Sequence, residues 1–165
     1  MSLEQDIAKI AQQEQTLRFE KFDNTTAFEL GLRLKAAAEA RGKAVAIDVQ
    51  LNGFPLFFYA MPGTSPDNAD WIRRKRNVVT KCHRSSYGVG LRMQSLDTSF
   101  AERYGAAVAD YATHGGCFPI FVRGVGCVGT VAVSGLPQRE DHNLVVAVLA
   151  ELLGQSYDEL KLADE

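Results

Sequence analysis

Apolar residues recur at about the helical period along residues 2–17 and predict a first helix. They are Leu3, Ile7, Ile10 and Leu17, and the positions between them are mostly polar. Ser2 and Gln5 have the spacing of a capping box, which favours a helix start at this point. So narrow an apolar face suits packing onto the rest of the domain or onto a neighbouring subunit.

A second helix is predicted over residues 26–41, after a short segment at 18–22 that suits an extended conformation. Its apolar face is made of small and medium residues, namely Ala27, Leu30, Gly31, Leu34, Ala37 and Ala38. Thr26 and Glu29 fit a capping box, and Gly42 stands where a left-handed helix cap belongs. A face this small and flat suits close packing on a sheet.

Residues 44–61 predict a β-hairpin, because Asn52-Gly53 is the strongest short signal for a two-residue type I′ turn. In the register set by this turn, the apolar pairs are Leu51 with Phe54, Val49 with Leu56, Ile47 with Phe58, and Val45 with Ala60. Pro55 then lies opposite Gln50, and its missing N–H suits an edge strand or a bulge.

Asp48 falls on the other face of this hairpin, opposite Phe57 and near Tyr59. An acid among aromatic residues has two interpretations. It is either a solvated residue on the outer face or an acid that lines a site and has a shifted pKa.

The helix predicted over residues 69–85 carries a charge inside its apolar seam. The residues that share this seam are Trp71, Ile72, Lys75, Val78, Val79 and Cys82. The other basic residues, mainly outside the seam, are Arg73, Arg74, Arg76, Lys81 and Arg84. This basic run is either a solvated helix face or a cation cluster at a cleft.

Two interpretations of Lys75 stay open at this point. Its stem either runs past the apolar neighbours to reach water, or Lys75 projects with Arg73 or Arg74 into a cleft and holds carboxylates or phosphates. Nucleic acid fits less well, because only Trp71 and Tyr87 offer stacking surfaces near the basic run.

The second half of the chain predicts one or two helices over 87–109, strands over 117–122 and 125–134, and a last helix over 138–154. The second strand has a small, lightly polar face formed by Gly126, Val128, Thr130, Ala132 and Ser134. That face either packs tightly under a helix or forms a flat floor beneath a ligand. Glu140 and Asp141 suit the positive end of the last helix and would oppose an anion there.

His114, followed by Gly115 and Gly116, is the candidate for an axial ligand or an acid/base group. The glycines permit positive φ, or let a ligand or another backbone segment come close. The alternative for His114 is a ring bonded to nearby backbone. No two histidines have chelating spacing, so no metal site is predicted. The predicted ligand-binding residues are His114, Gly115, Gly116, Arg73, Arg74, Lys75 and Trp71, and no catalytic residue is assigned.

Composition narrows the class of protein. The 165 residues suffice for one domain with a core, and no linker or repeat divides 1–165. A formal net charge of −2 gives no reason to expect nucleic acid or a membrane surface as partner. With neither a signal peptide nor a membrane span in the pattern, we expect a cytoplasmic protein. Its three cysteines are expected to be reduced and mostly buried.

Three segments resemble a known family. They are GTSPDNADWIRRKRNVV (63–79), HGGCFPI (114–120) and VGTVAVSGLPQREDHNLVV (128–146). Together they resemble a small uncharacterised branch of the HbpS/GlcG-like superfamily, whose members are often labelled haem-degrading domains. The wider superfamily pattern falls here on Gly115, Gly116, Pro119, Ile120, Val128, Gly129, Val133, Ser134, Gly135 and Asp141. One extra residue separates the glycines from Pro119, which marks a different loop.

The resemblance implies an α/β (α+β) fold of the profilin-like type, in which helices flank an antiparallel sheet of about five strands. It also implies self-association into dimers or larger rings. Relatives in the superfamily bind haem, or sit beside cobalamin and diol or glycolate metabolism. The Pro-Asp-Asn-x-x-Trp-Ile-Arg-Arg-Lys segment belongs to the branch rather than to the haem-binding relatives, so haem is the cofactor that the superfamily, not this motif, suggests.

Three classes of function compete. The first is binding of a small anionic ligand such as haem or a related tetrapyrrole, with His114 at the iron and basic groups at the propionates. The second is a non-catalytic oligomeric assembly or protein-interaction module. The third is an enzyme acting on a carboxylate substrate with Asp48 or Lys75 as acid or base, although no catalytic motif supports it.

Overall fold

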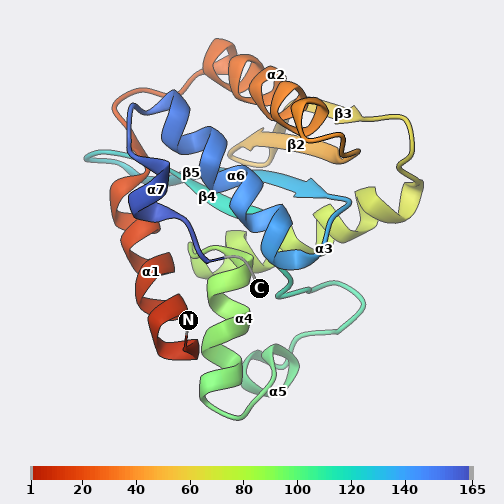
Figure 1. The fold of residues 1–165 in the computed structure, drawn as a ribbon. Helices are drawn as coiled ribbons and strands as arrows, with labels where there is room; N and C mark the ends of the chain where they lie inside the picture. The colour runs from red at the N-terminus through yellow and green to blue at the C-terminus, as the bar shows by residue number, and fades with distance from the viewer. Residues whose placement is uncertain (1, 164–165) are drawn as a thin grey trace.

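The computed structural model describes residues 2–163, and its centre is a five-stranded sheet with the order β1-β4-β5-β2-β3 (Figure 1). The strands are β1 (Arg18–Phe19), β2 (Ala46–Leu51), β3 (Phe54–Ala60), β4 (Cys117–Val122) and β5 (Gly126–Ser134). The pairs β2–β3, β2–β5 and β4–β5 are antiparallel, and the two-residue β1 adds a parallel edge to β4. The sheet of about five strands that the family resemblance implies is confirmed, with a parallel pair at β1 in an otherwise antiparallel sheet.

The β2–β3 hairpin turns at the predicted residues, and Asn52 and Gly53 both have positive φ. Beyond the first two pairs, however, the predicted register is wrong. Val49 pairs with Phe57 instead of Leu56, and Ile47 pairs with Tyr59 instead of Phe58. The cause is a bulge at Leu56, next to Pro55, because a residue without an N–H interrupts the ladder there. Asp48 consequently lies opposite Phe58.

Seven helices surround the sheet in the part of the chain that the structure describes. They are α1 (Leu3–Thr16), α2 (Asn24–Ala40), α3 (Pro66–Cys82), α4 (Ser86–Ser95), α5 (Phe100–Tyr104), α6 (Gln138–Leu152) and α7 (Tyr157–Leu160). Two of them start earlier than predicted. Asp23, not Thr26, caps α2 and accepts a hydrogen bond from the Thr26 amide at 3.0 Å. Ser65 precedes α3, whose first residue is Pro66.

The helices form a layer on each face of the sheet (Figure 1). α2 and α6 pack against each other and cover one face, where the main apolar core includes Leu30, Leu34, Val131 and Leu149. α3 crosses the other face, over β5, β4 and β2, and its Ile72 and Val79 pack on the small residues Ala46 and Ala132. The small face of β5 is therefore packed under a helix at Ala132. No helix among residues 2–163 is long and apolar enough to cross a lipid bilayer.

α1 packs within the chain, against α4 and α7. Its apolar Ile10 is buried, and its polar side also finds partners in the interior. The Gln13 amide donates to the carbonyl of Leu160 at 2.7 Å, and Arg139 bonds Asp6 at 2.8 Å. The first of the two alternatives left open by the sequence, docking onto the rest of the domain, is thus observed.

The contact of α2 with β3 depends on Gly31. A Cβ atom at this position would overlap the ring of Phe57. In an open helix position, alanine is about 1 kcal/mol more favourable than glycine. We nevertheless expect Gly31→Ala to lower the free energy of unfolding by about 1–3 kcal/mol, because the methyl group overpacks the helix–sheet contact.

Urea unfolding followed by circular dichroism measures this change. The matched control is Ala36→Gly, at an exposed position of the same helix. It should cost about 0.5–1 kcal/mol through helix propensity alone. A Gly31→Ala protein that is more stable than the parent would contradict the packing.

Candidate functional site

A cleft of about 290 Å³ opens where the first half of α3 meets the loop before β4 and the turn between β5 and α6. Four of the seven predicted ligand-binding residues line it: Trp71, Lys75, His114 and Gly115. Gln138 and Asp141, from the start of α6, complete its inner wall. We call this site the Trp71–His114 cleft.

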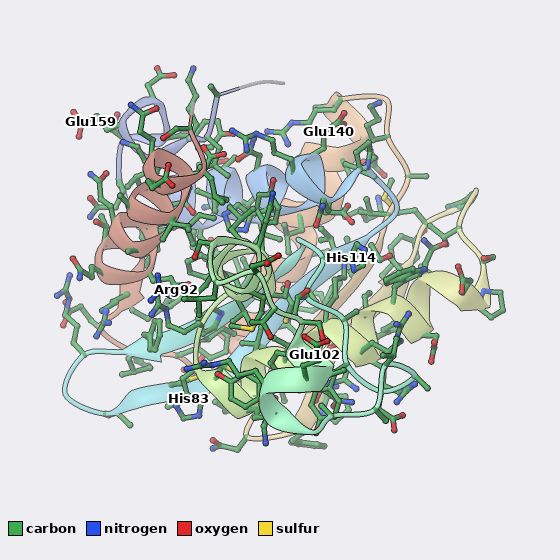
Figure 2. The ribbon with its side chains drawn as sticks, turned by 90° about the horizontal axis from the view of Figure 1, so that it is seen from below. His83, Arg92, Glu102, His114, Glu140 and Glu159 are labelled. Carbon is green, nitrogen blue, oxygen red and sulfur yellow. The ribbon has the colours of Figure 1, made fainter. Side chains whose placement is uncertain are left out.

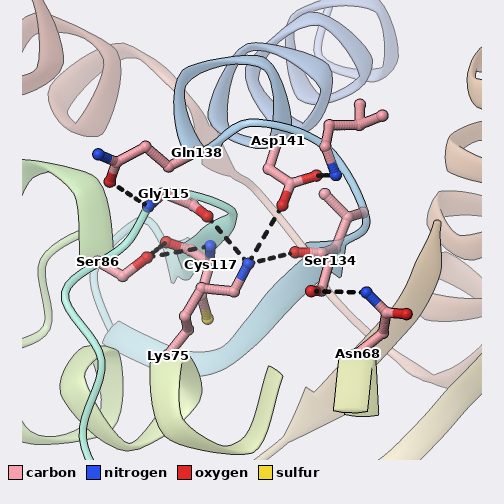
Figure 3. Close-up of polar contacts among 10 residues, drawn as sticks. Asn68, Lys75, Ser86, Gly115, Cys117, Ser134, Gln138 and Asp141 are labelled. Carbon is pink, nitrogen blue, oxygen red and sulfur yellow. Dashed lines mark hydrogen bonds and ion pairs between the residues drawn. The ribbon is translucent and has the colours of Figure 1, made fainter. Parts of the chain in front are cut away.

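The Lys75 ammonium lies at the floor of this cleft, with the side chain 3% exposed (Figure 3). It donates hydrogen bonds to the carbonyl oxygens of Gly115 at 2.9 Å and Val133 at 2.7 Å. It also faces the Asp141 Oδ2 at 3.4 Å. The stem therefore does not carry the charge to water, and that interpretation of Lys75 was wrong. All three donors of the ammonium have protein partners.

The Lys75–Asp141 pair is an ion pair held away from water. Burial lowers the pKa of Lys75, and the Asp141 charge opposes that shift. Burial likewise raises the pKa of Asp141 from 3.8 to about 6, opposed by Lys75 and by the Leu136 amide, which donates to its other oxygen at 3.1 Å. Each group therefore favours the charged form of the other, against the effect of burial.

Gly115 and Gly116 allow backbone segments to approach one another. A Cβ atom at Gly116, where φ is +125°, would lie 2.5 Å from the Lys75 Nζ and 2.5 Å from the Val133 oxygen. A Cβ atom at Gly115 would overlap the backbone of Gln138. Of the two roles open to these glycines, close approach of backbone is the one that the structure displays. They let carbonyl groups reach the buried ammonium.

His114 stands at the mouth of the cleft as an exposed ring beside Trp71 (Figure 2). The two rings meet edge to face, with centroids 4.9 Å apart. Within residues 2–163, no hydrogen-bond partner holds the His114 ring nitrogens, so the expected alternative of a backbone-bonded histidine does not apply. Burial of its inner edge, with Lys75 and Arg74 nearby, lowers the pKa of His114. The ring is therefore neutral at pH 7 and offers a free nitrogen lone pair.

Arg73 and Arg74 point to the loop after α5 rather than into the cleft. Arg73 pairs with Asp70 and with Asp110, each at 2.9 Å. Arg74 donates to the Val108 carbonyl at 2.8 Å, and its guanidinium lies 4.6 Å from the Trp71 ring centroid. These arginines thus anchor the 108–110 segment behind the Trp71–His114 cleft.

Asp48 is buried, so the solvated outer-face interpretation was wrong. It bonds Arg76 at 3.0 Å, and the Gln50 amide donates to it at 3.4 Å. Burial raises the pKa of Asp48, while the Arg76 charge opposes the rise. Asp48 does not line the Trp71–His114 cleft. Among the cysteines, all free, only Cys117 is buried, whereas Cys82 and Cys127 are half-buried.

The functional residue that the sequence interpretation missed is Asp141. It was assigned to the positive end of the last helix, where an exposed acid is common. Yet Asp141 is three, four and seven residues before Leu144, Val145 and Val148, which are buried. This periodicity placed an acid on the core side of α6 and pointed to a cation opposite it. Lys75, in the seam of α3, shows the same signal.

Comparisons with known proteins add to this geometry. Residues 22–150 match the family model described as haem degrading protein HbpS-like. A UPF0303 protein of Azotobacter vinelandii is 56% identical over 162 residues, covering 98% of each chain. The crystal structure of the Ybr137w protein has a TM-score of 0.84 at 29% identity and covers 90% of this chain and 87% of its own.

A fourth likeness concerns the fold alone. The crystal structure of a PduOC complex with haem has a TM-score of 0.66 and covers 80% of this chain and 94% of its own, at 14% identity. Its chain therefore shares the arrangement of strands and helices, and the bound haem is a property of that protein.

The Lys75–Asp141 pair should be a stability determinant. We expect Lys75→Met to lower the free energy of unfolding by about 3–5 kcal/mol, because the buried Asp141 carboxyl loses its counter-charge and must either stay unpaired or take up a proton. Lys75→Met combined with Asp141→Leu should cost less than the sum of the two single changes, since neither charge is then left alone.

Denaturant unfolding of the four proteins in this double-mutant cycle gives the coupling energy. Arg73→Met is the matched control on the same helix, because its ion pairs are half-exposed and worth about 0–1 kcal/mol. Additive effects of the two core changes would show that the pair is not coupled.

Proposed function

The chain belongs to the HbpS-like family of haem-degrading proteins, and from this premise we propose that it binds a small ligand at the Trp71–His114 cleft, with haem as the first ligand to test. The family inferred from the three sequence segments is confirmed by the match over 22–150 and by the 56% identical relative. The proposal is one of binding and assigns no reaction.

The observation that carries the proposal is His114. Histidines that stabilise a fold are usually bonded at one or both ring nitrogens, as His142 is to Gln13 at 2.7 Å. His114 instead presents a neutral ring at the mouth of a cleft, steadied by its edge-to-face contact with Trp71. A neutral imidazole is the usual protein ligand for haem iron. Trp71 adds an apolar surface on which a flat ligand can lie.

The residues present fit haem at its iron and at its edge over Trp71. The cleft of about 290 Å³ is slightly smaller than the usual ligand pocket, which measures about 300–1,000 Å³. A macrocycle would consequently extend past the cleft onto the adjoining surface. To bind the haem propionates, Arg73 would have to give up its contact with Asp110, or Arg74 its contact with Val108. When bound, haem supplies the iron centre, and this chain holds and orients it through His114.

Haem titration tests the proposal. We expect hemin to shift its Soret band on addition of the wild-type protein. We expect His114→Ala to weaken binding about tenfold or more, because the loss of an axial ligand removes at least about 1.4 kcal/mol of binding free energy.

The control is His83→Ala, which removes another exposed histidine at the far end of α3 (Figure 2). It should leave the titration unchanged. If the wild type gives no Soret shift, or if both variants weaken binding equally, haem binding at this cleft is wrong.

A second candidate function, self-association, is favoured by the edge of the sheet at β3. β3 pairs with β2 alone in the described chain, and its Phe54 and Phe58 are 65% and 53% exposed. Phe28 and Leu32 of the neighbouring α2 are also exposed. Large exposed apolar groups beside an unpaired strand edge are typical of a protein interface. We propose that a second copy of the chain covers this β3 edge.

Light scattering after size-exclusion chromatography tests self-association. We expect Phe58→Glu to lower the particle mass, by half if the edge forms a dimer, because a charge would be buried against an apolar partner. The control is Val125→Glu in the turn between β4 and β5, where the side chain is 71% exposed. A wild-type monomer, or an unchanged mass for Phe58→Glu, would exclude the β3 edge.

A further inference from the structure

A second and larger cavity lies away from the Trp71–His114 cleft. It measures about 500 Å³ and is enclosed by α1, the end of α3, α4 and α5. Its apolar wall includes Ile7, Ile10, Val89 and Met93. Ile10, Val89 and Met93 are buried, so the wall is continuous with the interior of the protein. We call it the α1–α4 cavity.

The rim of the α1–α4 cavity is basic. Lys81, Arg84 and Arg92 line it, and no acidic side chain does so among the described residues. Arg84 is neutralised by an ion pair with Glu14. Lys81 lies only over the Tyr104 ring, 5.7 Å from its centroid. Across residues 2–163, neither Lys81 nor Arg92 has a carboxylate partner. Two cations at the mouth of an apolar cavity are thus left without a counter-charge.

We propose that the α1–α4 cavity binds an amphipathic carboxylate, in the manner of a medium-chain fatty acid. The alkyl chain would lie against Ile7, Val89 and Met93, where each buried methylene contributes about 0.8 kcal/mol. The carboxylate would accept hydrogen bonds from Lys81 and Arg92, which supply the opposite charge. The volume falls inside the usual range for small-ligand pockets, about 300–1,000 Å³.

This site is separate from the proposed haem site. The two share no lining residue among the described residues, and Figure 2 labels Arg92 and His114 at different places on the molecule. Ile7 and Ile10 come from α1, which precedes the residues matched by the family model. The N-terminal helix thereby completes a cavity that the matched residues 22–150 would leave open.

The chain carries its own reporters for a test. Cys82 lines the α1–α4 cavity, Cys127 lines a different cleft beside β2, and Cys117 is fully buried. Cys82 and Cys127 are both half-buried. Burial raises the pKa of each thiol, so both are expected to react slowly with the alkylating reagent. Alkylation by iodoacetamide, resolved by peptide mass spectrometry, follows each thiol separately.

We expect decanoate to slow alkylation of Cys82 and to leave Cys127 unchanged. Decanol, which has the same chain without the charge, should need a higher concentration for the same protection. Lys81→Gln and Arg92→Gln should each raise the decanoate concentration for half-protection about tenfold, the loss typical of one charge-assisted hydrogen bond. Arg103→Gln, an exposed charge change on α5 outside the cavity, should have no effect.

As a control, thermal unfolding is measured for each variant, and a cooperative transition near that of the parent protein establishes that the fold is retained. The proposal is overturned if decanoate does not protect Cys82, or if decanol protects it equally well and the charge variants change nothing. It is also overturned if Cys82 is protected without ligand as the protein concentration rises, because a second copy then covers the cavity. The experiment uses no haem, so its failure leaves binding at His114 unaffected.

Discussion

The buried ammonium of Lys75 is the interaction on which the arrangement of the second half of the chain depends. It joins the loop before β4, the end of β5 and the start of α6 to helix α3 through Gly115, Val133 and Asp141. A single unpaired charge at this position would lower the stability of the fold, because water reaches neither the Lys75 ammonium nor the Asp141 carboxylate. The interior can hold the pair because backbone carbonyl oxygens supply the remaining hydrogen bonds, and because two glycines let those carbonyls come close.

The same contacts determine the shape of the Trp71–His114 cleft. Lys75 and Asp141 form its floor and are occupied with each other, so they give the cleft rigidity rather than a free charge. The groups that remain free to contact a ligand are the rings of His114 and Trp71, at the mouth of the cleft. Arg73 and Arg74 support this rim from behind by holding the 108–110 segment. The cleft is therefore polar and closed at its base, and aromatic and open at its mouth.

Much of the fold was predictable from periodicity and turn chemistry. The limits of β4 agree with the prediction, and the Asn52-Gly53 turn has the expected positive φ values. Local signals failed where another residue competed for the same role. Asp23 displaced Thr26 as the cap of α2, and the bulge at Leu56 shifted the hairpin register. Both outcomes depend on neighbours that a single pattern does not weigh.

Four of the seven predicted ligand-binding residues lie together in the structure, and their contacts were predictable only in part. His114, Trp71, Lys75 and Gly115 do meet at one cleft. The inward direction of Lys75 and the contact of Arg73 with the 108–110 segment could not be read from the sequence, because they depend on residues 36 or more positions away. The burial of Asp141 could have been predicted from helical periodicity, since Asp141 shares the buried face of Leu144 and Val148.

The polar contacts of α1 have a consequence for how the chain folds during synthesis. Gln13 and Asp6 are satisfied by Leu160 and Arg139, which follow them by 147 and 133 residues. A nascent chain emerging from the ribosome can form the β2–β3 hairpin locally, and Glu14 of α1 gains its partners once Arg84 and Ser85 are made. Gln13 and Asp6 must wait for the residues of α6 and α7. Helix α1 is thus made well before the residues that complete its polar contacts, and its docking depends on contacts of very long sequence separation.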